Sequence, residues 1–288
     1  MAIFSWSEAK LLDTSLSSLD GYFSEPPIRA QTLTGGLTNR CWKLVLADGT
    51  AYVWRPITPI TKAFFISRHE EYQVLSAIER LDIGPSPIVV NEQGLLVEWI
   101  AGETLYEGLE QDDLLKTLIS VHLVNTARLP LQPFSYTARV DHYWLQLDAV
   151  HKTETCTKIY QEWRVAPSIP SVGLSLCHFD LGGYNLVKNQ DGIKIIDWEY
   201  AALADPRLDL TLTIAVARLP VTEAVNKYCQ LRGIHDPQSW LDGVEAWLPR
   251  SQMMAMLWYL LAHQLWGGDS YLREAEALSH TLCSYDHV

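Results

Sequence analysis

The hydrophobic pattern of this chain changes character once, near Ala101-Gly102, and that change limits the folds the chain can adopt. Between Arg29 and Pro56, stretches such as CWKLVL and AYVWR alternate apolar and polar residues, and glycine-containing turns separate them. This alternation predicts three half-buried strands in a meander. Beyond the change the spacing is mostly helical up to the C-terminus, apart from Cys177 to Asp197. The chain is therefore expected to be an α+β protein, with an antiparallel sheet followed by a mainly helical region.

One helix and one hairpin are predicted between these two regions. The stretch SRHEEYQVLSAIERL places Glu71, Leu75 and Ile78 on one face of an amphipathic helix, and GPSP ends it. The stretch IVVNEQGLLVEWI then predicts two paired strands. We place a boundary between two lobes at about residues 98–102, so that residues 1–100 form the first lobe and residues 101–288 the second.

Composition limits the class of protein and its partners. The chain has 288 residues, of which 48% are hydrophobic, so it can bury a large core divided between two lobes. No stretch reaches the roughly 18 uninterrupted apolar residues of a membrane span, and we expect a cytoplasmic protein with no membrane partner. A formal net charge of −12 argues against a nucleic acid partner and is compatible with a cationic ligand. The five scattered cysteines indicate neither a disulfide framework nor a zinc site.

The segment CHFDLGGYNLVKNQDGIKIIDWEYA concentrates polar side chains around a short predicted hairpin, whose turn is NQDG. Asn185 and Asp197 should face each other at the open end of this hairpin, about 5 Å apart. An amide oxygen and a carboxylate placed in this way form a site for a hard cation such as Mg²⁺. Asp180, on the loop before the hairpin, is available to accept a proton from a substrate hydroxyl. The arrangement predicts phosphoryl transfer.

These residues also match a known family. HFDLGGYN followed by IKIIDWEYA resembles the catalytic and metal-binding segments of the protein-kinase-like small-molecule kinases, which include aminoglycoside phosphotransferases and choline, ethanolamine and thiamine kinases. TGGLTNRCWKL is similar to the strand-turn-strand that covers the nucleotide phosphates in the choline-type members. The resemblance extends from about Leu33 to Leu212 with its landmarks in the expected order. It implies a two-lobe kinase fold that uses ATP and Mg²⁺.

The resemblance assigns roles to individual positions, following the template in which positioning and charge neutralisation carry phosphoryl transfer. Asp180 corresponds to the catalytic base, His178 braces the catalytic loop, and Asn185 and Asp197 hold magnesium. The implied nucleotide site comprises a basic residue with its ionic partner, the glycine turn and the hinge: Arg55, Glu71, Gly35, Gly36, Thr38, Asn39, Glu98, Trp99 and Ile100. Glu70 is a second candidate for the partner of Arg55. Asp205 and Asp209 are expected to cap or anchor a helix and to support the catalytic loop.

Aromatic residues are numerous where an acceptor pocket is expected, and the candidates for contact with the substrate are Glu199, Trp198, Tyr200, Trp258 and Trp266. Aromatic faces and a carboxylate favour an organic cation. The competing interpretation is that these rings pack in the core. The segments IDWEYA and GGLTNR resemble choline, ethanolamine and thiamine kinases more than antibiotic-modifying relatives. Phe179 and Tyr184 depart from the family pattern, because relatives more often carry small or polar residues there.

The first hypothesis is an ATP-dependent, magnesium-requiring kinase that phosphorylates the hydroxyl of a small cationic alcohol, with choline or ethanolamine first and thiamine close behind. The alternatives are an aminoglycoside-type phosphotransferase and an inactive nucleotide-binding module. The sequence leaves open the acceptor, the choice between ATP and GTP, and the oligomeric state.

Overall fold

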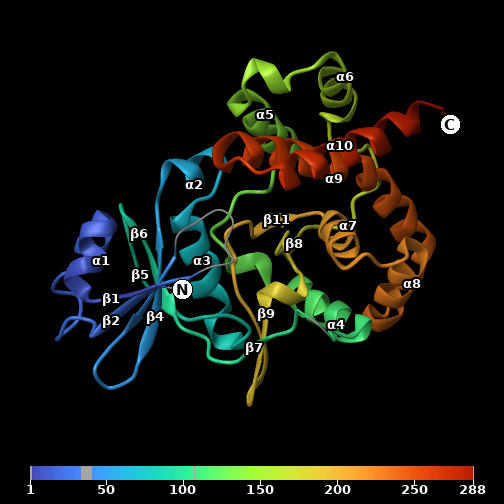
Figure 1. The fold of residues 1–288 in the computed structure, drawn as a ribbon. Helices are drawn as coiled ribbons and strands as arrows, with labels where there is room; N and C mark the ends of the chain where they lie inside the picture. Colours follow the sequence, from blue (N-terminus) through green and yellow to red (C-terminus); the bar gives the residue numbers. More distant parts are fainter. Residues whose placement is uncertain (1, 34–40, 107, 288) are drawn as a thin grey trace.

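The computed structural model describes residues 2–33, 41–106 and 108–287. A sheet lies on one side of the molecule and most of the helices lie on the other (Figure 1), which confirms the predicted α+β class. The sheet is antiparallel and six-stranded, in the order β1-β2-β3-β4-β6-β5. Its strands are β1 (Ile3–Phe4), β2 (Arg29–Thr32), β3 (Trp42–Val45), β4 (Ala51–Pro56), β5 (Pro87–Asn91) and β6 (Gly94–Glu98).

Helices cover both faces of this sheet. Helix α3 (Arg68–Ile78) packs Val74, Leu75 and Ile78 against one face, as the predicted apolar stripe requires. Ser67 starts α3 because its hydroxyl accepts a hydrogen bond from Glu70 N at 3.2 Å. Helix α1 (Trp6–Leu12) belongs to a separate core on the opposite face, and the short helix α2 (Pro59–Ala63) follows β4. Strand β1 and helix α1 precede the meander and were not predicted.

The rest of the chain is mostly helical, with two small sheets inserted. The helices are α4 (Gln111–His122), α5 (Tyr136–Gln146), α6 (Glu154–Trp163), α7 (Pro206–Ala217), α8 (Val221–Arg232), α9 (Pro237–Trp266) and α10 (Asp269–Cys283). The strands form the sheets β10-β9-β7 and β11-β8 and are β7 (Glu103–Thr104), β8 (Ser175–Cys177), β9 (Leu186–Asn189), β10 (Gly192–Ile195) and β11 (Ala202–Ala204). Strands β7, β8 and β11 were not predicted, because each is only two or three residues long.

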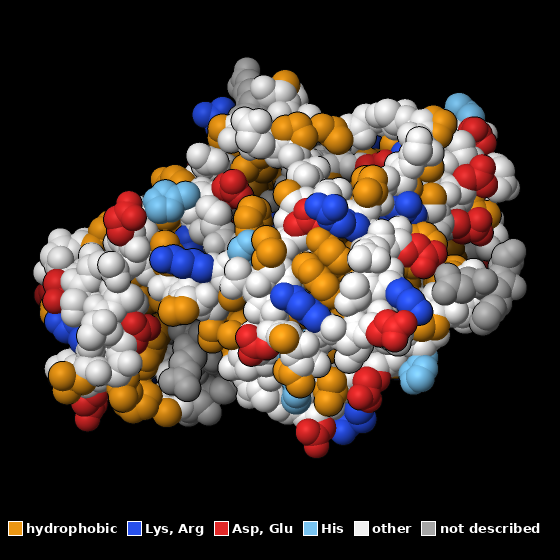
Figure 2. All heavy atoms as spheres, turned by 90° about the horizontal axis from the view of Figure 1, so that it is seen from above, with side chains coloured by type: hydrophobic (Ala, Val, Ile, Leu, Met, Phe, Trp, Pro, Cys, Tyr) orange, Lys and Arg blue, Asp and Glu red, His pale blue; other side chains and the backbone are white. Residues whose placement is uncertain are grey.

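The chain passes from the large sheet to the small one within a few residues, since β6 ends at Glu98 and β7 begins at Glu103. The division at residues 98–102 nevertheless stays a prediction. One apolar core extends from α3 and the large sheet to α4, α7 and α8, and a second lies among α5, α6, α9 and α10. No helix in the described residues is both long and apolar enough to span a bilayer. On the face drawn in Figure 2, acidic and basic side chains are interspersed.

Candidate active site

The loop after β8 carries the predicted catalytic residues and is held by a single carboxylate. Asp209, buried on α7, accepts hydrogen bonds from His178 N and Phe179 N, both at 2.8 Å. These bonds hold Phe179 in a left-handed conformation with φ 66°, which is unfavourable for a bulky residue. Asp205, at the start of the same helix, accepts from Arg207 N at 2.9 Å and acts as the N-cap. The expectation that Asp205 and Asp209 anchor a helix and support this loop is confirmed.

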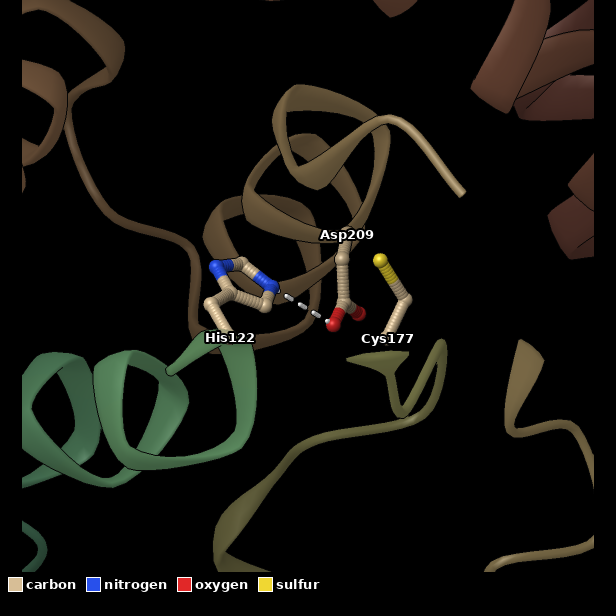
Figure 3. A group of neighbouring side chains, drawn as sticks. All are labelled: His122, Cys177 and Asp209. Carbon is tan, nitrogen blue, oxygen red and sulfur yellow. Dashed lines mark hydrogen bonds and ion pairs between the residues drawn. The ribbon is translucent and has the colours of Figure 1, made fainter. Parts of the chain in front are cut away.

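Asp209 belongs to a buried polar chain that includes His122 and neighbours Cys177 (Figure 3). His122 Nε2 lies 3.0 Å from Asp209 Oδ2, and His122 Nδ1 lies 2.7 Å from Tyr228 Oη. Because the Arg232 guanidinium donates to Tyr228 Oη, the phenol is free to donate to Nδ1, and His122 donates from Nε2. Burial raises the pKa of the Cys177 thiol well above its usual range. The carboxylate is thus engaged by three N–H donors and the thiol stays protonated, so this cluster braces the loop and is a poor metal site.

His178 joins the loop to the hairpin that follows. It is completely buried, and burial lowers its pKa, which favours the neutral ring. Its Nε2 lies 3.1 Å from Ile196 O and its Nδ1 lies 3.3 Å from Asp180 N. A neutral ring protonated on Nε2 satisfies both contacts, as donor to the carbonyl and acceptor from the amide. These contacts place His178 as a brace rather than as a group in contact with a substrate.

Asp180 projects into a cavity of about 500 Å³, and two neighbours on its own loop fix its carboxylate. Tyr184 Oη donates a short hydrogen bond to Asp180 Oδ1, and Asn185 Nδ2 donates to Oδ2 at 3.0 Å. Burial raises the pKa of Asp180 to about 7, although the bond from Tyr184 opposes this shift. A carboxyl group with a pKa near neutrality is suited to accept a proton from an alcohol.

The two glycines between Asp180 and Tyr184 are required by close approaches. A Cβ added to Gly183 would lie 2.3 Å from the carbonyl oxygen of Leu105, just after β7. A Cβ added to Gly182 would lie 2.5 Å from the ring of Tyr184. Gly183 can therefore lie against the Leu105 carbonyl only because it has no side chain, whereas a side chain at position 182 would require the Tyr184 ring to move.

The hairpin of β9 and β10 forms around the predicted turn, but its register differs from the expectation. Leu186 pairs with Ile195, so Asn185 lies opposite Ile196, whose N–H donates to Asn185 O at 2.9 Å. The prediction that Asn185 faces Asp197 is therefore wrong by one residue. Asp197 has a φ of 65°, a left-handed turn of the backbone that follows the last pair. Asn185 and Asp197 both line the same cavity as Asp180.

A cluster of five charged groups lies beside this hairpin. Arg55 Nε lies 2.9 Å from Glu71 Oε1, so the expected ion pair is present, and Glu70 is exposed. The Arg55 guanidinium also contacts Asp197 closely and lies 2.9 Å from Glu199 Oε2. Burial disfavours the charge on Arg55, but Asp197 and Glu71 outweigh burial and raise its pKa well above the usual value. Burial likewise opposes ionisation of Asp197, yet the charge of Arg55 lowers the pKa of this carboxyl.

Arg68 completes this cluster and was missed by sequence reasoning. It is 1% exposed, contacts Glu71 closely, and lies 3.1 Å from Glu199 Oε2. Its spacing of three residues from Glu71 on a helix was the available signal, because such residues share a face. Two guanidinium groups therefore share three carboxylates. Glu199 forms ion pairs with both Arg55 and Arg68.

The substrate candidates separate into two groups. Glu199, Tyr200 and Trp258 line the cavity, and Trp258 Nε1 donates to Tyr200 Oη at 3.0 Å. Trp198 is buried and donates from Nε1 to Ile195 O at 2.8 Å, so it is a core residue and its proposed contact with substrate is wrong. Trp266 stacks on Phe64 with ring centroids 5.1 Å apart and lies outside the described cavity wall. The core interpretation therefore holds for these two tryptophans.

The expected nucleotide site is only partly within the described residues. Gly35, Gly36, Thr38 and Asn39 lie outside them. Glu98 N donates to Ser86 O at 2.9 Å and Trp99 N to Ala51 O at 3.1 Å, so contacts with a base have to come from other backbone groups. Glu98, Trp99 and Ile100 line a second cavity of about 500 Å³, beside the tip of the β9–β10 hairpin. Lys43 Nζ lies 3.7 Å from the centre of the Trp99 ring.

Comparison with known proteins decides the family. The phosphotransferase enzyme family matches residues 29–241. The chain belongs to this family. The thiamine kinase of Escherichia coli O17:K52:H18 is 26% identical over 248 residues, which cover 85% of this chain and 87% of that protein. The family and this relative support a small-molecule kinase, as the resemblance implied.

Solved structures share the fold of this family member. Choline kinase LicA from Streptococcus pneumoniae has a TM-score of 0.71 and 17% identity, with 97% of this chain and 100% of that chain covered. The complex of LicA with AMP has a TM-score of 0.72 and 16% identity, with 93% and 96% covered. The GDP complex of aminoglycoside 2′-phosphotransferase-IIIa has a TM-score of 0.64 and 14% identity, with 94% and 98% covered. These likenesses confirm the kinase-like fold.

Proposed function

We propose that the chain is a Mg-ATP-dependent kinase that phosphorylates the hydroxyl of a small organic alcohol carrying a positive charge. The observation that carries this proposal is Asp180, held by Asn185 within one cavity that Asp197 and aromatic rings also line. Thiamine is the first candidate acceptor, because a thiamine kinase is a relative in sequence over most of the chain. Choline and ethanolamine come second, because the likeness to choline kinase is one of fold.

The residues fit a magnesium nucleotide. Both N–H bonds of the Asn185 amide go to Asp180, at 2.9 and 3.0 Å, which leaves the amide oxygen as a metal ligand. Asp197 shares one oxygen with Arg55 and has a second for a metal ion. Amide and carboxylate oxygens are the ligands that Mg²⁺ prefers. When bound, the nucleotide would supply the phosphoryl group, and the metal ion would neutralise the negative charge of the phosphates.

The residues of the chain itself prepare the acceptor. Asp180 takes the proton of the acceptor hydroxyl, and Asn185 keeps its carboxylate oriented. Tyr184 Oη occupies Asp180 Oδ1 in this structure, so the acceptor hydroxyl has to share or replace that contact. The rings of Tyr200 and Trp258 provide an apolar wall that excludes water from the acceptor.

The test measures ADP release with Mg-ATP against thiamine, choline, ethanolamine and kanamycin. We expect turnover of thiamine first, and loss of at least about a hundredfold in kcat for Asp180→Asn, because the general base is removed. Asp148→Asn is the matched control, because Asp148 is exposed and does not line the cavity, and this variant should keep full activity. Turnover of kanamycin alone would favour the aminoglycoside alternative. Equal, negligible rates for the native protein and Asp180→Asn would favour the inactive module.

A further inference from the structure

Arg139 on α5 lines the same cavity as Asp180, and sequence reasoning did not single it out. Its guanidinium lies among aromatic rings. The distances from its central carbon to the ring centres are 5.2 Å for Phe65, 5.4 Å for Phe134, 5.7 Å for Tyr200 and 6.0 Å for Tyr143. The positive charge of Arg139 therefore already contacts the aromatic rings that were expected to bind a cationic substrate.

This guanidinium has few polar partners. Within the described part of the chain, Arg139 forms no ion pair, and its one hydrogen bond runs from Nη1 to Tyr143 Oη at 3.5 Å. Its Nε is buried without a hydrogen-bond partner among the same residues. An arginine has five N–H donors in one plane, and leaving them unpaired away from water is unfavourable. The donors that face the cavity are thus available to a ligand.

We propose that Arg139 binds a hydrogen-bond-accepting group on the part of the acceptor remote from its reactive hydroxyl. The accepting group is a heteroaromatic ring nitrogen or an anionic oxygen, since both match the donors of a guanidinium. This inference rests on the proposed function and narrows the substrate class. A trimethylammonium group offers no acceptor and would bring a like charge toward Arg139, so choline fits poorly. Thiamine fits, because its cationic ring bears the hydroxyethyl group and its pyrimidine nitrogens lie at the other end.

The test compares thiamine with 5-(2-hydroxyethyl)-3,4-dimethylthiazolium, which keeps the cation and hydroxyl but lacks the pyrimidine. In Arg139→Met we expect the KM for thiamine to rise by about 10- to 100-fold, the range for a hydrogen bond to a charged group. The KM for the truncated thiazolium should change by less than about twofold. The kcat for each compound should also change by less than about twofold. Arg139→Lys should recover part of the loss, because lysine keeps the charge without the planar fork.

Arg80→Met, at an exposed arginine outside the cavity, is the matched control and should leave both KM values unchanged. An equal rise in KM for both compounds in Arg139→Met would show that Arg139 only supports the wall, and an unchanged KM for thiamine would overturn the proposal directly.

Failure of the proposed function has a different signature, namely that the native protein phosphorylates neither compound. Quenching of tryptophan fluorescence, with Trp258 in the cavity wall, then measures binding of thiamine and of pantothenate, an alcohol with an anionic oxygen. Binding of either that weakens about tenfold or more in Arg139→Met upholds the inference. Binding that is equal in both proteins, or absent in both, refutes it.

Discussion

Arg55 and Arg139 lie near the same cavity but in opposite surroundings. The Arg55 guanidinium contacts three carboxylates, and two of these, Glu71 and Glu199, also contact Arg68. The Arg139 guanidinium contacts four aromatic rings and has one long hydrogen bond. The first arrangement uses the donors of the arginine to join the sheet to the β9–β10 hairpin. The second leaves donors for a ligand, so two chemically identical groups are expected to differ in what they contribute to stability and binding.

The largest expected effect tests the carboxylate side of this comparison. Glu71→Gln removes one carboxylate from a buried cluster and leaves Arg68 with Glu199 alone. Removal of one partner of a buried ion pair costs about 3 to 5 kcal/mol in the free energy of unfolding, which corresponds to a fall of about 5 to 15 °C in Tm. Thermal unfolding followed by circular dichroism measures it.

Glu70→Gln is the matched control, because Glu70 is the exposed neighbour of Glu71 on the same helix. It should change stability by less than about 0.5 kcal/mol. Equal effects of the two substitutions would mean that the buried cluster is not a source of stability.

A smaller effect tests the aromatic side. Trp258→Leu removes a ring of the cavity wall and the hydrogen bond to Tyr200. It should raise the KM for the acceptor by about tenfold, because the two losses together are worth about 1.5 kcal/mol. The KM for ATP should stay unchanged.

Trp266→Leu should leave both KM values unchanged. It should lower the free energy of unfolding by about 1 kcal/mol, because the stacking of Trp266 on Phe64 is lost. A rise in the KM for the acceptor in Trp266→Leu would show that Trp266 does contribute to acceptor binding.

The smallest effect concerns Tyr184, an aromatic residue of the cavity wall that contacts the Asp180 carboxylate. Tyr184→Phe keeps the ring but removes the hydroxyl that bonds to Asp180. Water then has access to the carboxylate, and ADP release without any acceptor should rise by about two- to tenfold, the range for one hydrogen bond. Tyr259→Phe is the control, because Tyr259 lines the cavity and forms no hydrogen bond with Asp180 among the described residues. No rise, or the same rise in both variants, would exclude a role for the Tyr184 hydroxyl in protecting Asp180.

Local patterns predicted much of the fold, because they depend on residues close in sequence. The alternation in CWKLVL and AYVWR and the turn NQDG gave the strands and the hairpin that positions Asn185. The register was wrong by one residue because the turn has two residues between Asn189 and Gly192, and turn length sets the register of a hairpin. Helix α1 had a readable signal that was missed, since Ser5 and Glu8 form a capping box.

The walls of the site were harder to predict, because they depend on contacts between distant segments. Trp198 and Tyr200 are two residues apart, yet one packs in the core and the other lines the cavity. Arg139 reaches Phe65, which is far away in sequence, and nothing near Arg139 in the sequence indicates this contact. The family resemblance singled out Asp180 and Asn185, which line the cavity, but gave no signal for Arg139.

The contact between Asp209 and the catalytic loop also bears on how the protein becomes active during synthesis. Asp209 follows His178 and Phe179 by about thirty residues and supplies both acceptors for their N–H groups. A ribosome releases Asp180, Asn185 and Asp197 before α7 emerges, so a nascent chain of that length contains every proposed reacting group but lacks the carboxylate that holds Phe179 at positive φ. The loop geometry that the proposed activity requires is therefore expected only once α7 has packed against the loop.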